Sequence, residues 1–224
     1  MGLRDWDSKG ILRIGASITI GSQFLPSYVK AFSQICSDVD VRVTIEQSER
    51  LEQKILANEL DFALIEGISH DPNIKSEAYM EDYLSVVCPA NGNWKQGQMI
   101  SVDEFKKQRF LLREHGSGTR EVFDRVILQA GFAVSPVWEA MSTTALVNAT
   151  INGLGISVLP HRMVLPALRQ GLLRTVKVQD LVFVRNFYII YHKDKFLTNS
   201  AKQFIALCNS YEMDYPLPSY TGLY

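Results

Sequence analysis

Short apolar runs with β-type spacing alternate along the chain with longer stretches of helical spacing. The runs at residues 11–15, 41–45 and 61–65 are rich in branched apolar side chains, which favours strands. Between them, apolar residues recur at helical spacing over residues 24–32 and 51–56, which predicts two helices. The order strand, helix, strand, helix, strand predicts a parallel sheet with right-handed crossovers.

A second alternating series follows the turn-rich residues 89–93, which we interpret as a crossing between two lobes. Its expected elements are a strand at 109–112, a helix at 117–130, a strand at 137–141, a helix at 143–152 and a strand at 156–159. Residues 181–191 are β-rich again, and residues 197–211 carry a final helical pattern. The sequence therefore predicts an α/β fold of two Rossmann-like lobes, with a ligand-binding cleft between them.

The expected division of the chain follows from these patterns. We expect residues 1–10 to be the remnant of a linker, residues 11–88 and 192–212 to form lobe I, residues 89–191 to form lobe II, and residues 213–224 to be a flexible C-terminal tail. The tail carries two prolines and has no periodicity, which is typical of a loose arm.

Composition narrows the class of protein. The 224 residues are 46% hydrophobic and 21% charged, close to the average for soluble globular proteins. Lys and Arg number 23 against 24 Asp and Glu, so there is no basic surplus for binding DNA. The three cysteines (Cys36, Cys88 and Cys208) form no CxxC pair, which disfavours disulfides and zinc and fits a reducing compartment. The N-terminus is charged and does not resemble a signal peptide, and no apolar run approaches the ~20 residues that span a bilayer. We therefore expect a cytoplasmic protein without membrane contact.

The segment 113–120 (Arg-Glu-His-Gly-Ser-Gly-Thr-Arg) gives the sharpest local signal. It follows an expected strand and opens an expected helix, whose first N–H groups favour an anion. Gly116 and Gly118 let the backbone approach a ligand, and Ser117 and Thr119 add hydroxyl groups. The alternative is that Ser117 is an ordinary N-cap and that the glycines only turn the chain. The sequence leaves both interpretations open.

Other strand ends carry short polar side chains too. Ser17 and Thr19 follow the first strand, Glu66 follows the third, and Ser142 and Thr143 precede a helix of the second series. Ligands of open α/β sheets bind beyond the carboxyl ends of the strands. The serines and Thr143 are also ordinary helix caps, but their recurrence at several strand ends favours a site for a small polar ligand.

Catalytic and metal-binding patterns are weak. The four histidines are scattered without an HExxH motif, and GxSxG is absent. His161 follows Pro160 and is expected to begin a helix. We expect no enzyme, no metal site and no cofactor.

Four segments resemble the effector-binding domain of LysR-type transcriptional regulators. They are residues 11–26, residues 58–67, the RExGSGTR-like residues 113–120 and the GxGIxxLP-like residues 152–160. They lie in the order of the family, and the lobe pattern around them covers about residues 11–210. The resemblance implies a fold like that of type 2 periplasmic binding proteins, a homodimer or tetramer, and a small-molecule effector, often an anion. It also implies DNA binding through an N-terminal winged helix-turn-helix, which this chain lacks, so we expect a truncated regulatory domain.

The resemblance also implies which residues line the cleft between the lobes. These are Ser17, Thr19, Glu66, Arg113, Gly116, Ser117, Gly118, Thr119 and Thr143. Glu66 departs from the family, which often has a hydroxyl or small residue there. An acid would repel a purely anionic effector and suit one that also carries an ammonium group, or else it points away from the cleft. The alternative function on the same fold is a solute-binding protein for transport.

Overall fold

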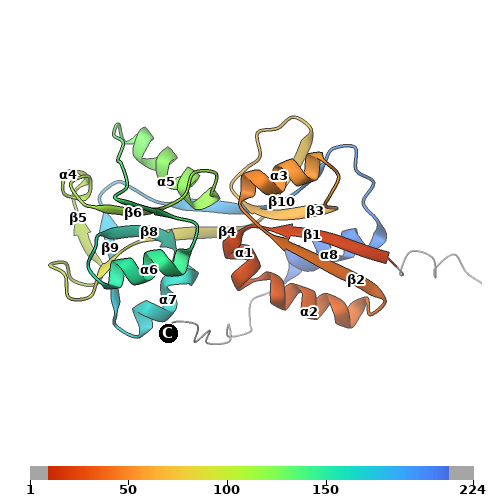
Figure 1. The fold of residues 1–224 in the computed structure, drawn as a ribbon, viewed down its shortest axis with the longest axis horizontal. Coiled ribbons are helices and arrows are strands. Elements are labelled where there is room, and N and C mark those ends of the chain that lie inside the picture. The colour runs from red at the N-terminus through yellow and green to blue at the C-terminus, as the bar shows by residue number, and fades with distance from the viewer. Residues whose placement is uncertain (1–9, 212–224) are drawn as a thin grey trace, which may run out of the picture. The chain divides into compact units, whose positions relative to one another are not determined.

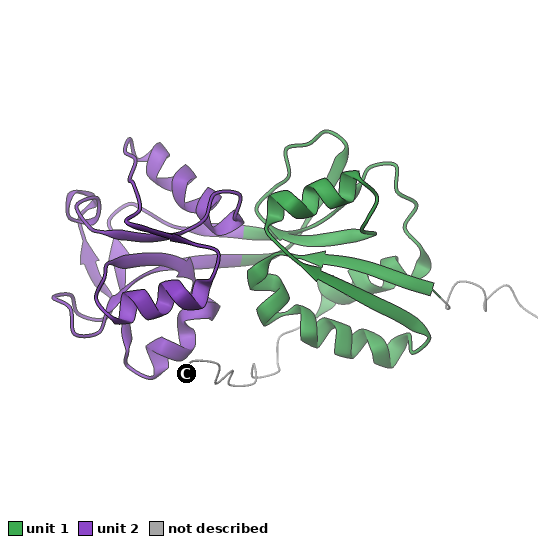
Figure 2. Cartoon of the chain, viewed as in Figure 1, with its two compact units in different colours: residues 1–81, 186–216 green, residues 82–185, 217–224 purple. Residues whose placement is uncertain are grey.

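The computed structural model describes residues 10–211, which divide into two compact units. One unit comprises residues 10–81 and 186–211, and the other comprises residues 82–185 (Figure 2). The chain passes from one unit to the other inside two strands, β4 (Ile74–Pro89) and β10 (Val184–His192). The crossings predicted from the sequence, after residues 88 and 191, lie in the same two strands. The expected linker at residues 1–9 and the expected tail at 213–224 lie outside the described residues.

The first unit is built on a sheet with the strand order β2-β1-β3-β10 (Figure 1). Its elements are β1 (Gly10–Ala16), α1 (Ile18–Gln23), α2 (Leu25–Ile35), β2 (Val39–Ile45), α3 (Ser48–Leu56), β3 (Phe62–Glu66), parts of β4 and β10, and α8 (Asn199–Ser210). β1 pairs in parallel with β2 and with β3, as predicted, whereas β10 pairs antiparallel with β3.

The alternation of side chains along β3 explains how helices cover both faces of this sheet. Phe62 and Leu64 belong to the apolar cluster that includes Phe204 of α8, while Ala63 and Ile65, which point to the opposite face, pack in the cluster of α3. Both faces of β3 are therefore buried, which accounts for its uninterrupted apolar sequence.

The second unit repeats this construction on a sheet with the strand order β4-β8-β6-β7, to which β9 adds beside β4 and β5 beside β9. Its elements are part of β4, β5 (Gln98–Ile100), α4 (Val102–Phe105), β6 (Phe110–Arg113), α5 (Gly118–Gln129), β7 (Trp138–Ala140), α6 (Thr143–Ile151), β8 (Ile156–Pro160), α7 (His161–Arg169) and β9 (Leu173–Val178). β6 is parallel to β7 and β8, whereas β4 is antiparallel to β8. The strands that alternate with helices are parallel to one another, as predicted, whereas the two strands that cross between the units run antiparallel to β3 and β8.

Gly155 shows why the second sheet needs a glycine just before β8. A Cβ atom on Gly155 would lie 2.3 Å from the carbonyl oxygen of Arg109. That oxygen accepts a hydrogen bond from the Ile156 amide at 2.8 Å, so the two strands meet here through their backbones. Any side chain at position 155 would push β8 away from β6.

Candidate functional site

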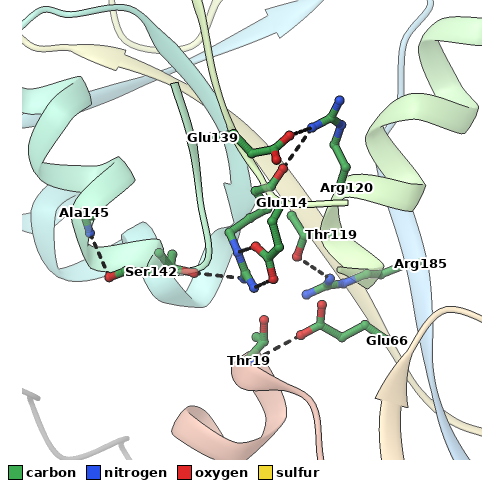
Figure 3. A network of polar contacts seen from close by, with 11 residues as sticks. Thr19, Glu66, Glu114, Thr119, Arg120, Glu139, Ser142, Ala145 and Arg185 are labelled. Atoms are coloured by element: carbon green, nitrogen blue, oxygen red, sulfur yellow. Dashed lines mark hydrogen bonds and ion pairs between the residues drawn. The ribbon is translucent and has the colours of Figure 1, made fainter. Parts of the chain in front are cut away.

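In the first unit, three polar side chains gather where β1 and β3 end. Ser17 is the N-cap of α1, and its hydroxyl donates to Glu66 Oε1 at 3.2 Å instead of capping its own helix. The amide of Thr19, in the first turn of α1, donates to the same oxygen at 3.2 Å (Figure 3). All three residues are at most 3% exposed. The helix amide and the hydroxyl together stabilise a buried carboxylate.

These two hydrogen bonds fix the position of one carboxylate oxygen of Glu66. Oε1 is directed at the first turn of α1. The side chain of Thr19 stands beside it, and among the described residues its hydroxyl has no hydrogen-bond partner although the residue is 1% exposed. A buried hydroxyl without a partner is costly unless another molecule supplies one. The first unit thus offers an anionic group and an unsatisfied hydroxyl next to each other.

In the second unit, Arg113 lies at the end of β6 and is 2% exposed. Its Nε and one terminal nitrogen donate to the two carboxylate oxygens of Glu114 at 2.8 and 2.9 Å, and its other terminal nitrogen donates to the Thr143 hydroxyl at 3.2 Å. The predicted site residues Arg113 and Thr143 are therefore brought together. The guanidinium is held by neighbours of its own unit, so it fixes the β6–α5 loop against the start of α6.

The loop then turns at Gly116, whose φ of 83° is in the left-handed region that favours glycine. Ser117 is the N-cap of α5 and is 3% exposed, yet its side chain makes no capping hydrogen bond. Gly118 and Thr119, the first residues of α5, are buried as well. The result is a buried helix N-terminus with a serine hydroxyl that does not cap the helix, and the positive end of a helix dipole is suited to an anion.

Two further arginines hold this loop in place, and sequence reasoning missed both of them. Arg120, 5% exposed, donates to Glu139 at 3.0 Å (Figure 3) and to the carbonyl oxygen of Arg113 at 3.0 Å. It also pairs with Asp124. Its terminal nitrogen also lies 3.2 Å from His115 Nε2. One guanidinium thus ties the loop to α5 and to β7.

Arg185 is the second missed residue. It is 3% exposed, pairs with Asp82 at 2.8 and 2.7 Å, and donates to the Thr119 hydroxyl at 3.0 Å. Thr119 is therefore oriented by a buried cation. A signal was present in the sequence, because Arg185 is a lone charge in an otherwise apolar β-rich stretch.

His161 begins α7, as predicted, directly after β8. Its Nδ1 lies 2.9 Å from the Ser85 hydroxyl, and the ring stacks on Tyr83 with centroids 4.7 Å apart. Burial lowers the pKa of His161 below its ordinary value, and Arg162 adds to this, while the charge of Asp82 acts in the opposite direction. The ring is an aromatic surface at the carboxyl end of β8.

No group of three or more His, Cys, Asp or Glu side chains within residues 10–211 has the arrangement of a metal site. Over the same residues, no helix is both long and apolar enough to cross a membrane.

The family model described as the LysR substrate binding domain matches residues 7–211. The chain belongs to the LysR substrate-binding domain family. This LysR domain is similar to the uncharacterized HTH-type transcriptional regulator YeiE of Escherichia coli K12, with 30% identity over 203 residues, which are 91% of the chain and 69% of YeiE. The chain spans 58 to 69% of the length of the first curated relatives it matches.

Solved structures of LysR domains share this fold. The regulatory domain of CcmR from Synechocystis PCC6803, in complex with 2-PG, matches with a TM-score of 0.83 and 20% identity, covering 93% of this chain and all of that one. The effector-binding domain of QuiR, in complex with shikimate, matches with a TM-score of 0.79 and 17% identity, covering 89% and 95% of the two chains. The family resemblance and the two-lobed fold class are confirmed. The family consists of effector-binding domains of transcriptional regulators and not of enzymes.

Proposed function

We propose that this chain is the effector-binding and dimerisation domain of a LysR-type transcriptional regulator and senses a small polar metabolite that carries an anionic group. The candidate groups for holding this effector are the N-terminus of α5 in the second unit and the polar cluster around Glu66 in the first unit. The full-length regulator is a cytoplasmic homodimer or tetramer that binds DNA through an N-terminal helix-turn-helix. The effector alters DNA binding through its different affinity for two arrangements of the domain.

The N-terminus of α5 carries the anionic part of this proposal. Ser117 is buried and its side chain does not cap its own helix, so its hydroxyl can donate to an anion at the start of α5. The Thr119 hydroxyl beside it is already held by Arg185. This combination of donors and positive potential favours a carboxylate or phosphate. The ligands of CcmR and QuiR, 2-PG and shikimate, are small molecules as well.

The first unit sets the other requirement on the effector. Glu66 places a carboxylate beside the Thr19 hydroxyl, and both are buried. A second anionic group at this end would be repelled, whereas a hydroxyl or an ammonium group would be bound by these acceptors. We therefore propose an effector with an anion at one end and a hydrogen-bond donor at the other, that is, a hydroxy acid or an amino acid.

A thermal-shift screen of the domain against hydroxy acids, phosphorylated acids and amino acids tests this function. A ligand at about 100 times its Kd stabilises the folded domain by ~2.7 kcal/mol, which raises Tm by roughly 5 to 11 °C. We expect Ser117→Ala to weaken binding of such a ligand about tenfold or more, because a hydrogen bond to a charged group is lost. The exposed Ser33, on α2, provides the control, and Ser33→Ala leaves the Kd unchanged.

The near-isosteric variant Glu66→Gln then separates the two effector classes. It removes a charge, so an amino acid with an ammonium group loses about tenfold in affinity, while a hydroxy acid keeps or gains affinity. A ligand whose Kd is the same in the wild type, Ser117→Ala and Glu66→Gln refutes this site. A solute-binding protein for transport, the alternative function on this fold, is disfavoured by the match to transcriptional regulators.

A further inference from the structure

A cavity of about 380 Å³ lies in the second unit, at the opposite ends of the strands that lead to the α5 loop. Arg109 and Gly155, which line it, come just before β6 and β8, whereas Arg113 comes at the end of β6. Four residues of strand span about 13 Å, so the cavity is separate from the N-terminus of α5. Its volume is in the range of small-molecule sites. The cavity is lined by Cys88, Pro89, Gly92, Asn93, Trp94, Glu104, Gln108, Arg109, Gly153, Leu154, Gly155 and Ile156.

One wall of this cavity is a tryptophan held in a fixed position. The indole N–H of Trp94 donates to Glu104 Oε1 at 2.7 Å, and the carbonyl oxygen of Trp94 accepts from Arg174 at 2.9 Å. The ring is half-buried and packs against the apolar cluster around Phe110. Its orientation is therefore set before any ligand binds, which lowers the entropic cost of stacking on it.

Arg109, whose side chain is exposed, is the cationic residue among those that line this cavity. Among the described residues, the guanidinium of Arg109 makes no hydrogen bond and no ion pair, although its backbone oxygen is fixed by the Ile156 amide. Arg109 and Gly155, which approach each other closely, both line the cavity, and Leu154, 39% exposed, contributes apolar surface. A planar guanidinium is matched by a carboxylate, with which it forms two parallel hydrogen bonds.

From these groups we infer that the second unit has a second small-molecule site, which binds a small aromatic carboxylate. The ring of the ligand stacks on Trp94, and its carboxylate pairs with Arg109. Glu104, which also lines the cavity, accepts from a hydroxyl or amino substituent of the ring. This site does not depend on the effector site at α5.

Titration of the ¹⁵N-labelled domain with 4-hydroxybenzoate tests the inference, with 4-hydroxybenzamide as the uncharged analogue. The indole N–H signal of Trp94, assigned through Trp94→Phe, reports on this cavity alone. We expect a saturable shift of that signal with the carboxylate and a much weaker one with the amide. Arg109→Gln raises the Kd about tenfold or more, which is the loss expected for a charge-assisted pair. Lys107→Gln, which removes an exposed charge nearby, leaves the Kd unchanged.

Two controls make the outcome decisive. Ser117→Ala alters the proposed effector site and leaves the Trp94 titration as in the wild type. The inference is overturned if the Trp94 signal does not move at millimolar carboxylate, if Arg109→Gln leaves the Kd unchanged, or if Ser117→Ala abolishes the shift. In the last case the probe binds only at α5, and the cavity is not a site of its own.

Discussion

Replacing Arg185 with methionine isolates the energetic role of a deeply buried ion pair of the second unit. The side chains of Arg185 and Asp82 are 1% and 5% exposed, and two guanidinium nitrogens lie 2.8 and 2.7 Å from one carboxylate oxygen. Methionine keeps much of the apolar length of arginine but removes every donor. Asp82 is then left as a buried charge without this partner, and Thr119 loses the donor that orients its hydroxyl.

We expect Arg185→Met to lower the free energy of unfolding by a large amount. Breaking a buried pair from one side typically costs 3–5 kcal/mol of folding free energy, because the remaining charge stays desolvated. For a domain of about this size, each kcal/mol corresponds to roughly 2–4 °C, so Tm should fall by roughly 6 to 20 °C. The double variant Asp82→Leu/Arg185→Met removes the stranded charge as well. We expect it to be more stable than Arg185→Met alone, since a buried pair is often replaced by apolar side chains without loss.

Thermal unfolding followed by circular dichroism measures these differences. Arg125, an exposed arginine on α5, provides the matched control, and Arg125→Met leaves Tm within experimental error. The reasoning is refuted if Arg185→Met lowers Tm no more than Arg125→Met does. It is also refuted if the double variant is less stable than Arg185→Met, because the cost would then not come from the stranded carboxylate of Asp82.

Two further predictions concern stability. Gly155→Ala places a Cβ against the Arg109 carbonyl oxygen, so we expect the free energy of unfolding in urea to fall by about 2 kcal/mol or more. The matched variant Gly171→Ala meets no atom within 4 Å, so it costs only the strain of its φ of 70°, about 1 kcal/mol. Equal losses for the two variants would contradict the close approach. Burial lowers the pKa of His161 below its ordinary value of 6.5. As the pH falls, the unfolded chain therefore takes up a proton at this residue before the folded chain does. His161 thus lowers the free energy of unfolding as the pH drops from 6.5 towards the lower pKa of the folded state. We expect His161→Gln to flatten that part of the pH profile, and an unchanged profile would exclude the effect.

Much of the secondary structure could be predicted from local pattern. The uninterrupted apolar residues of β3 predict a buried strand from local sequence alone. The end of α5 is likewise marked locally by Gly131, whose φ is 81°. Beyond the helix start expected at His161, the local pattern predicts no element for residues 162–180, which form the rest of α7 and β9. α7 contains Pro166, which disfavours a helix interior, and its packing in the apolar cluster of α6 decides against that local preference.

The candidate site was predictable in type but not in detail. The sequence placed hydroxyls and an acid at strand ends, and the structure brings Ser17, Thr19 and Glu66 together in the first unit. Whether these residues bind an effector stays a prediction. The periodicity of the sequence does not predict that Arg113 is bound by Glu114 and Thr143, because these contacts depend on where three side chains meet in space.

By itself, the sequence determined the alternation of strands and helices, the division into two lobes and the resemblance to LysR-type regulators. These three properties follow from short-range periodicity and from contiguous motifs, because local sterics and burial determine both. Only the tertiary structure decided which charges are paired. Asp82 and Arg185 are 103 positions apart in the chain, and Glu66 and Ser17 are 49 apart. Such pairs form because a buried charge must find a partner wherever the folded sheet brings one, and no local pattern records that partner.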